Sequence, residues 1–276
     1  MTQLKRSVIK VNGVKLFYRD SLIKSQPFLC LHGKWGRGET WSDFIWRYGN
    51  EYRIIAPDQR GHGFSDKPVA RYAPQDMAED AFGLITQLKC KPAIVMGHSM
   101  GGRNAAFLAA LHPEAVKALI ILDIGLATSK KISSLPPSEI EPIDELTFDW
   151  PTPYKTLNDA IKHLTSKYKR KSNSDYFLES LTETTEGYDF LFSRYSMAAI
   201  EEYLHDWTYI LPKIKCPTLL VRAESSIDLT IEEAEIMRKG IENCKYVEVK
   251  NSDHMVYVDN PESFYLILDE FLSTIQ

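Results

Sequence analysis

Hydrophobic residues in this chain follow two alternating patterns. Short, largely apolar runs rich in Val, Ile and Leu, typical of strands buried on both faces, occur at residues 28–31, 53–56, 94–96, 118–122 and 218–221. Stretches with apolar residues at helical spacing occur at residues 41–48, 77–88, 103–111, 231–241 and 261–275. This alternation predicts an α/β fold with a mostly parallel central sheet flanked by helices.

Two stretches depart from this pattern. Residues 7–20 alternate between apolar and polar about the dipeptide Asn12-Gly13, which predicts a β-hairpin. Residues 126–212 contain no apolar strand run and, after a proline-rich entry, show amphipathic helical patterns at 157–170, 176–184 and 197–211. We therefore expect an inserted helical lid at 126–212, with 1–125 and 213–276 forming the core.

Composition and charge narrow the class of protein. The 276 residues carry 33 basic and 37 acidic side chains, a net charge of −4, so nothing indicates a nucleic-acid-binding surface. No apolar run approaches the roughly 20 residues of a membrane span, and no apolar signal core follows the first residues. Four scattered cysteines without metal-ligand spacing favour a reducing compartment, and we expect a cytoplasmic location.

Candidate chemistry lies in the sequence Gly97-His98-Ser99-Met100-Gly101, which joins an apolar strand pattern to an Ala- and Leu-rich helical pattern. The spacing Gly-x-Ser-x-Gly in that context predicts a nucleophile elbow, a strained turn that lifts a serine hydroxyl clear of the sheet. Side chains at the two glycines would clash where the helix passes the strand. Ser99 is therefore the candidate nucleophile, and the Met100 N–H points toward whatever binds there.

Four motifs together carry a family resemblance: Leu31-His32-Gly33, residues 58–65 (DQRGHGFS), residues 97–102 (GHSMGG) and residues 253–262 (DHMVYVDNPE). On these residues the chain resembles the α/β-hydrolase superfamily along nearly its full core, closest to the small esterase, C–C hydrolase and non-metal haloperoxidase-like branch. Similar dehalogenases and epoxide hydrolases carry Asp at the elbow, so the serine at position 99 implies acyl chemistry.

The resemblance also implies a base and an acid, since a serine hydroxyl needs a base within hydrogen-bond reach. In this fold the triad members follow in the order serine, acid, histidine. His254 follows a strand and precedes the last helix, where the family places its base. The family's usual acid position falls after the 218–221 strand, and Asp228 is the nearest carboxylate there. Asp123 and Glu224 remain alternatives.

An oxyanion hole is expected from two backbone N–H groups, those of Met100 and of Lys34, the residue after His32-Gly33. Lys34 departs from the aromatic or apolar residue common at this position in the family. If its ammonium faces the pocket, it favours an anionic substrate group. If it points to solvent, as most lysines do, it has no such role.

Four aromatic side chains are candidates for the substrate pocket: Trp35, Trp150, Tyr154 and Trp207. Aromatic residues in an inserted segment can line an apolar acyl or alcohol site. They can equally attach the insertion to the core, and the sequence does not separate these two uses.

These observations lead to one expected function and two alternatives. We expect a serine hydrolase that cleaves a small to medium carboxylic ester or lactone through an acyl-enzyme intermediate, without metal or cofactor. One alternative is hydrolysis of a C–C bond beside a carbonyl. The other is a ligand receptor or non-catalytic relative with a hydrolase fold, because the acid motif departs from the family pattern.

Overall fold

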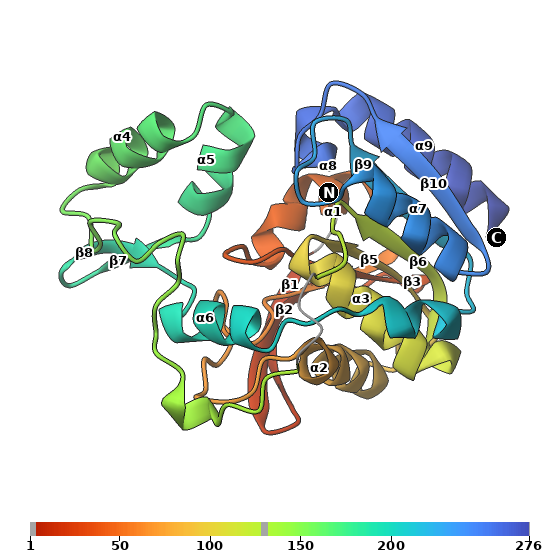
Figure 1. The fold of residues 1–276 in the computed structure, drawn as a ribbon, viewed down its shortest axis with the longest axis horizontal. Coiled ribbons are helices and arrows are strands. Elements are labelled where there is room, and N and C mark those ends of the chain that lie inside the picture. The colour runs from red at the N-terminus through yellow and green to blue at the C-terminus, as the bar shows by residue number, and fades with distance from the viewer. Residues whose placement is uncertain (1–3, 128–131, 276) are drawn as a thin grey trace.

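The strands form one mixed sheet of eight, in the order β1-β2-β4-β3-β5-β6-β9-β10 (Figure 1). The computed structural model describes residues 4–127 and 132–275. β1 and β2 pair antiparallel with each other and β2 pairs antiparallel with β4, and all further neighbours are parallel. The strands are β1 (Lys5–Val11), β2 (Val14–Asp20), β3 (Pro27–Leu31), β4 (Arg53–Pro57), β5 (Ala93–His98), β6 (Val116–Leu122), β9 (Thr218–Ala223) and β10 (Cys244–Val249).

Both faces of this sheet are covered, which explains why its central strands are apolar at most positions. In β3, Leu29 and Leu31 pack into one hydrophobic cluster, while Phe28 and Cys30 pack into another on the opposite face. The first cluster includes α2 (Pro74–Gln87), α3 (Met100–Leu111) and α7 (Ile231–Gly240). The second includes α1 (Ser42–Tyr48), α8 (Val256–Asp259) and α9 (Pro261–Thr274). Short 3-10 turns occupy Gly38–Trp41, Pro113–Ala115, Pro137–Glu139 and Thr208–Lys213.

The β-hairpin expected near the start of the chain is present. β1 and β2 are joined by Asn12 and Gly13, whose φ angles of 49° and 84° are both positive. Such a two-residue turn matches the twist of the flanking strands, and Asn-Gly is the pair that adopts it with least strain.

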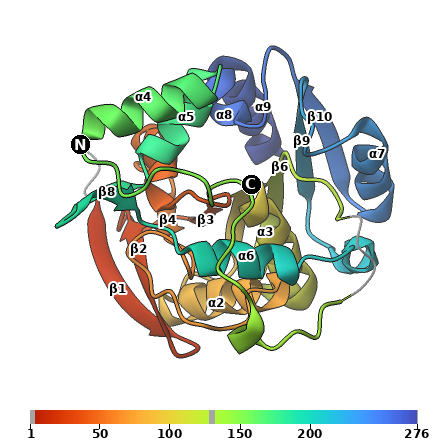
Figure 2. The ribbon, with the colours of Figure 1, turned by 60° about the vertical axis from the view of Figure 1, so that its left-hand side comes forward.

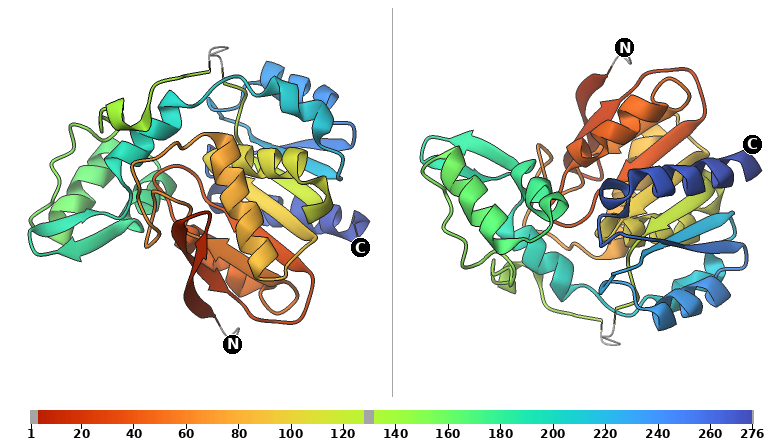
Figure 3. Two further views of the ribbon diagram at one scale, coloured as in Figure 1. Left: turned by 90° about the horizontal axis from the view of Figure 1, so that it is seen from below. Right: turned by 90° about the horizontal axis from the view of Figure 1, so that it is seen from above.

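We call residues 126–212 the cap segment. Its residues 154–190 lie to one side of the sheet (Figures 1 and 3), whereas Trp207, Ile210 and Leu211 pack into the core cluster. Within the cap segment, the structure describes residues 126–127 and 132–212. Their regular elements are α4 (Leu157–Lys167), α5 (Lys171–Leu178), β7 (Leu181–Thr184), β8 (Gly187–Phe190) and α6 (Arg194–Glu202). No helix among residues 4–127 and 132–275 is long and apolar enough to cross a membrane.

The helix expected at 176–184 is wrong beyond Leu178, where α5 ends. Residues 181–190 form the antiparallel hairpin β7–β8 instead. Three threonines disfavour helix here, because a β-branched side chain loses rotamer freedom against the preceding turn. Gly187, with φ of 132°, then makes a turn that other residues rarely adopt. The third expected helix also ends early, at Glu202.

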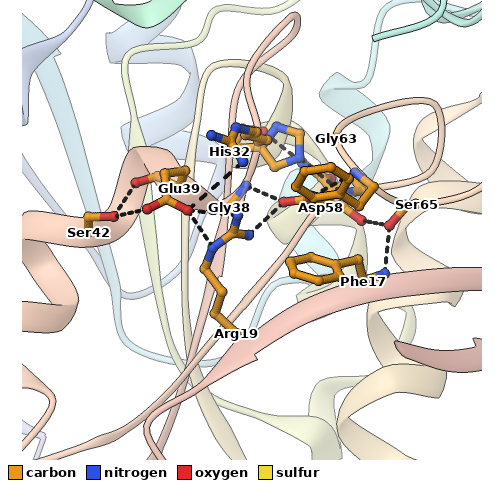
Figure 4. Close-up of polar contacts among 12 residues, drawn as sticks. Phe17, Arg19, His32, Gly38, Glu39, Ser42, Asp58, Gly63 and Ser65 are labelled. Atoms are coloured by element: carbon orange, nitrogen blue, oxygen red, sulfur yellow. Dashed lines mark hydrogen bonds and ion pairs between the residues drawn. The ribbon is translucent and has the colours of Figure 1, made fainter. Parts of the chain in front are cut away.

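A buried ion pair fixes the loop that follows β3 (Figure 4). The Asp58 carboxylate, fully buried after β4, accepts hydrogen bonds from the Arg19 guanidinium at 2.8 Å and from the Gly38 backbone N–H at 2.7 Å. Its other oxygen accepts from the Phe64 N–H at 2.9 Å. Gly63 has a φ of 53°, and a Cβ there would lie 2.0 Å from that oxygen. The loops after β3 and β4 are therefore held together at the carboxyl edge of the sheet.

Gly101→Ala tests how tightly α3 packs on the sheet. A Cβ at Gly101 would lie 2.3 Å from the Leu31 carbonyl oxygen and 2.6 Å from that of His32. Alanine normally stabilises a helix relative to glycine, by about 1 kcal/mol. Here we expect the free energy of unfolding, measured by urea denaturation, to fall by about 3 kcal/mol because backbone must move.

Gly13→Ala is the control for this variant, because no atom lies within 4 Å of the added Cβ and only its positive φ is strained. Its expected cost is about 1 kcal/mol. A Gly101→Ala protein as stable as the wild type would contradict the close packing of α3 on β3.

Candidate active site

Ser99 alone forms the turn between β5, which ends at His98, and α3, which begins at Met100. Its φ of 53° and ψ of −125° are unusual for a residue with a side chain. A Cβ at Gly97 would lie 2.1 Å from the Gly101 carbonyl oxygen, so the helix crosses almost in contact with the strand. The Ser99 N–H donates to the Leu122 carbonyl of β6 at 2.9 Å. This strained turn leaves the serine partly exposed.

His254, in the loop after β10, directs one ring nitrogen toward two carboxylates. Its Nδ1 lies 2.9 Å from Asp123 Oδ2 and 3.2 Å from Asp228 Oδ2. Because Nδ1 donates to a carboxylate, the neutral ring carries its proton there, and Nε2 keeps the lone pair that a general base uses. The His98 ring fixes the loop by donating from Nε2 to the His254 carbonyl oxygen at 2.9 Å.

The two carboxylates at His254 differ in burial and in hydrogen bonding. Asp123, directly after β6, is fully buried. Its Oδ1 accepts from the Ala223 N–H at 2.8 Å, and its Oδ2 accepts from the Ser226 hydroxyl at 2.8 Å. Asp123 is therefore held in one orientation before it contacts the imidazole. Its φ of 48° is left-handed, a conformation that Asp tolerates better than most residues.

Asp228, the carboxylate expected from the sequence, lies at the exposed tip of the loop after β9. Its side chain is 43% exposed. Glu224, the other alternative, is directed elsewhere: it accepts from the Asn251 N–H at 2.8 Å and pairs with Lys250 at 3.1 Å. The structure thus brings two of the three candidate carboxylates to His254, and the shorter contact is made by the buried one.

The loop after β3 runs beside the serine. A Cβ at Gly33 would lie 3.3 Å from the Ser99 Cβ, so only a glycine fits comfortably there. Lys34 follows directly, and Met100 is the first residue of α3, where backbone N–H groups have no acceptor within the helix. Both residues expected to contribute the oxyanion hole are therefore adjacent to Ser99.

The Lys34 side chain points neither to open solvent nor freely into the site. Its ammonium lies 3.1 Å from Asp144 Oδ1 and 2.8 Å from Glu201 Oε1, both in the cap segment. It also lies 4.5 Å from the Trp35 ring centroid. Its charge is already compensated by two carboxylates, and the side chain connects the core to the cap segment.

A cavity of about 510 Å³ opens above Ser99 and His254. Its walls come from the loop after β3, the start of α3, the cap segment and the loop before α8. Lining residues include Trp35, Ser99, Met100, Arg103, Tyr176 and His254. A second, more open hollow of about 1110 Å³ adjoins it at Lys34 and Trp35, but neither Ser99 nor His254 lines that hollow.

Trp35 lines this cavity as expected, but the other three aromatic candidates do not. Trp150 packs inside the hydrophobic cluster of the cap segment. The Tyr154 hydroxyl hydrogen-bonds to His163 Nδ1 at 2.5 Å. Trp207 is completely buried, and its indole N–H donates to the Gly125 carbonyl at 3.2 Å. These large side chains stabilise the cap segment and its junction with the core, because each aromatic side chain that is removed from water buries a large apolar area.

Among the cavity residues that were not identified from the sequence are Arg103 and Tyr176. Arg103 lies one helical turn after Ser99, and Tyr176 lies on α5. The signal for Arg103 is a charged residue in a helix whose other positions are almost all small or apolar. Tyr176 carries no comparable signal, because its position depends on how the cap segment folds over the core.

One group of potential metal ligands comes together in the described part of the chain: Asp123, Asp228 and His254, with ligand atoms within 4.8 Å of one another. The donors already present account for this cluster. The Ala223 N–H and the Ser226 hydroxyl donate hydrogen bonds to Asp123, and His254 directs its Nδ1 proton toward the two carboxylates. The arrangement fits a hydrogen-bonded imidazole better than an ion site.

Comparison with known proteins agrees with this fold. A sequence model described as the alpha/beta hydrolase fold matches residues 26–261. The chain belongs to the alpha/beta hydrolase family. The expected fold class is therefore confirmed, including the mostly parallel sheet flanked by helices.

Individual relatives within this family are distant. The chain is 39% identical over 95 residues to 2-(acetamidomethylene)succinate hydrolase of Mesorhizobium japonicum, a match that covers 34% of each protein. It is 25% identical to human serine hydrolase BPHL over 289 aligned positions, covering 98% of this chain and 87% of that one. A crystal structure of E-2-(acetamidomethylene)succinate hydrolase superposes with a TM-score of 0.84 at 24% identity, covering 98% and 100% of the two chains.

The two histidines at this site, His254 and His98, have pKa values shifted in opposite directions. Burial by itself would lower the pKa of His254, because it disfavours the imidazolium. The hydrogen bond to Asp123 and the negative charges of Asp228 and Asp253 outweigh burial, so the pKa of His254 is raised above its ordinary value. Burial lowers the pKa of His98 well below its ordinary value, and the nearby His254 lowers it further. His98 is therefore a neutral structural ring, while His254 holds a proton readily.

The pKa of His254 tests which carboxylate controls the ring. Following the His254 Cε1 proton by NMR, we expect a wild-type pKa above about 6.5, and a decrease of about one unit or more in Asp123→Asn. The decrease in Asp228→Asn should be smaller, because that carboxylate is more exposed.

A raised histidine pKa also has a defined effect on stability. The stabilisation is fully present below the unfolded-state pKa of about 6.5 and is lost as pH rises through the folded-state value. The difference in free energy of unfolding between wild type and His254→Gln should therefore narrow as the pH rises above about 6.5 and through the folded-state pKa of His254. If the pKa of His254 is unchanged in Asp123→Asn, the hydrogen bond to Asp123 is not the main cause of the raised pKa.

Proposed function

We propose that this protein is a serine hydrolase that cleaves a small to medium carboxylic ester or lactone through an acyl-enzyme intermediate. One observation carries the proposal: the buried Asp123 accepts a 2.9 Å hydrogen bond from His254 Nδ1, and His254 shares a cavity with Ser99 at the elbow. A nucleophile, a base and a group that orients the base are the parts that acyl transfer needs.

In the first half of the reaction, Ser99 Oγ attacks the carbonyl carbon while His254 Nε2 takes the hydroxyl proton. Asp123 holds the imidazole in the required tautomer and stabilises the imidazolium that forms. The tetrahedral oxyanion is stabilised by the N–H groups of Met100 and Lys34. The imidazolium then protonates the leaving alcohol, and the acyl group remains on Ser99.

In the second half, water replaces the alcohol. His254 takes a proton from water, the hydroxide attacks the acyl-enzyme, and the serine leaves with the proton from the imidazolium. The acid is released and the enzyme is restored. The nucleophile, the base, the acid and the oxyanion donors in these steps all belong to the chain itself, so the proposed reaction uses no metal or cofactor.

We assign the acid role to Asp123 rather than to Asp228. Two fixed donors orient Asp123 in a buried position, where a charge interacts strongly with the developing imidazolium. Asp228 is partly exposed, and water screens its charge. Asp228 then acts as a supporting charge that adds to the stabilisation of the imidazolium.

The cap segment is proposed to shape the substrate site. Its residues on α5 and α6, including Tyr176, Ile200 and Glu201, line the cavity together with core residues. Met100 and Arg103 of α3 line the same cavity (Figure 2 shows the helices), so a substrate bound there would contact both the cap segment and the core. The relatives fit this class of chemistry, since one is named a serine hydrolase and another a hydrolase of a substituted succinate.

The proposed compartment is the cytoplasm. All four cysteines are unpaired thiols, and Cys30 and Cys90 are buried. Small buried thiols without disulfides are typical of proteins in a reducing environment.

Ser99→Ala tests the nucleophile. A fluorophosphonate probe reacts with an activated serine, so we expect the wild type to be labelled and Ser99→Ala to remain unlabelled. Mass spectrometry of the labelled peptide gives the site. The matched control is Ser273→Ala, which removes an exposed hydroxyl near the end of α9 that bonds only to the Glu270 carbonyl, and this variant should still be labelled.

Label on Ser99→Ala would reject the nucleophile. A wild-type protein that neither reacts with the probe nor hydrolyses any ester, lactone or C–C substrate would instead favour the ligand-receptor alternative.

Paired aspartate variants test the acid. Loss of a triad carboxylate costs about 10⁴ in turnover in the serine-protease example, or roughly 5 kcal/mol of barrier. We expect Asp123→Asn to lower kcat on a hydrolysed ester by about 10³ to 10⁴, and Asp228→Asn to lower it by about tenfold or less. Both variants should retain the wild-type circular dichroism spectrum. The reverse order of effects would reassign the acid to Asp228.

A further inference from the structure

Arg103 is a buried cation at the wall of the cavity that holds Ser99. It lies in the first turns of α3, one helical turn beyond the elbow, and is 4% exposed. Its side chain lines the same cavity as Ser99 and His254. The backbone of Arg103 lies about one helical turn, or roughly 5–6 Å, along the helix axis from that of Ser99.

No carboxylate of the described residues pairs with Arg103. The other three buried arginines do pair: Arg19 with Asp58, Arg60 with Asp80 and Arg222 with Glu248. In Arg103 the Nε–H is buried without a hydrogen-bond acceptor. Burial lowers its pKa to about 10, and the negative charge of Glu201 offsets this only in part.

The other charged groups that face the cavity are already matched. Lys34 contacts Asp144 and Glu201, Asp253 contacts Arg170 at 3.2 Å, and Asp228 lies beside His254. Among the described charged residues that line the cavity, Arg103 alone has no oppositely charged group at contact distance. Buried charges in proteins are paired or bind a ligand.

We infer that Arg103 binds a carboxylate of the substrate, and hence that the substrate is an ester or lactone carrying a free carboxylate a few carbons from the scissile carbonyl. This inference rests on the proposed function and narrows its substrate class. A guanidinium presents two parallel N–H donors in the plane that a carboxylate matches, and the contact replaces the missing acceptor. Its place on the helix of the nucleophile fixes the distance between bound carboxylate and attacked carbon.

The test compares two esters of nearly equal shape and different charge. Monomethyl succinate carries a carboxylate where methyl levulinate carries an acetyl group. The measured quantity is the ratio of kcat/KM for the two esters, which cancels any general loss of activity. We expect the wild type to favour monomethyl succinate, and this ratio to fall by about 100-fold in Arg103→Met, which keeps an unbranched side-chain stem and removes the charged guanidinium.

Two further variants sharpen the result. Arg103→Lys keeps the charge but loses the paired donors, so its ratio should lie between those of wild type and Arg103→Met. Arg238→Met removes an exposed, distant arginine and controls for net charge, and its ratio should equal the wild-type value. A ratio unchanged in Arg103→Met, or lowered equally in Arg238→Met, would overturn the inference.

A binding measurement needs no turnover, and its labelling experiment needs only the wild type. Succinate should slow fluorophosphonate labelling of the wild type, while the neutral succinamide should not. Calorimetric titration with succinate should show binding that Arg103→Met loses.

These arms separate the two ideas. Succinate binding lost in Arg103→Met without hydrolysis of either ester would reject the ester or lactone function and keep the carboxylate site. Hydrolysis of both esters without preference, and without succinate binding, would keep the serine hydrolase and reject the role of Arg103.

Discussion

The near-contact of α3 with the sheet is the constraint on which the site depends. Gly97 and Gly101 let the helix cross β5 and the end of β3 at backbone distance, with no room for a methyl group at either position. The chain has one residue, Ser99, in which to reverse from strand to helix, and that residue takes a left-handed conformation. The same close crossing sets the N-terminus of α3 beside the loop after β3. The position of Ser99, the placement of the N–H groups at the start of α3 and the approach of the loop after β3 thus all follow from one packing contact.

The second organising feature is the convergence of parallel strands at their carboxyl ends. β6 ends in Asp123, β9 leads to Ser226 and Asp228, and β10 leads to His254. Since neighbouring parallel strands end at the same edge, residues about 100 or more positions apart form one hydrogen-bonded group. Burial then separates the two carboxylates: Asp123 is fixed by backbone and hydroxyl donors, while Asp228 stays at the loop tip and contributes charge rather than orientation.

The charges around the cavity divide into those that hold the molecule together and one that does not. Lys34 joins the core to the cap segment through Asp144 and Glu201, so a cation that looks suited to a substrate is used for attachment. Arg103, hidden in the helix of the nucleophile, has no such partner among the described residues. Selectivity for an anionic substrate would then come from the rigid elbow helix rather than from the cap segment, and would be set at a fixed distance from Ser99.

The sequence by itself determined the features that depend on residues close together in the chain. The hairpin at Asn12-Gly13, the alternating buried strands and helices, the elbow at Ser99 and the loop position of His254 all follow from local backbone preference and short-range periodicity. It left open which carboxylate meets the histidine, which cation faces the cavity uncompensated, and whether Trp150 and Trp207 line a site or seal a core. It also missed the β7–β8 hairpin, whose short strands carry little periodic signal. Only the tertiary structure decided these points, because each depends on through-space pairing and burial between segments far apart in the chain, and a residue's type does not reveal its partner.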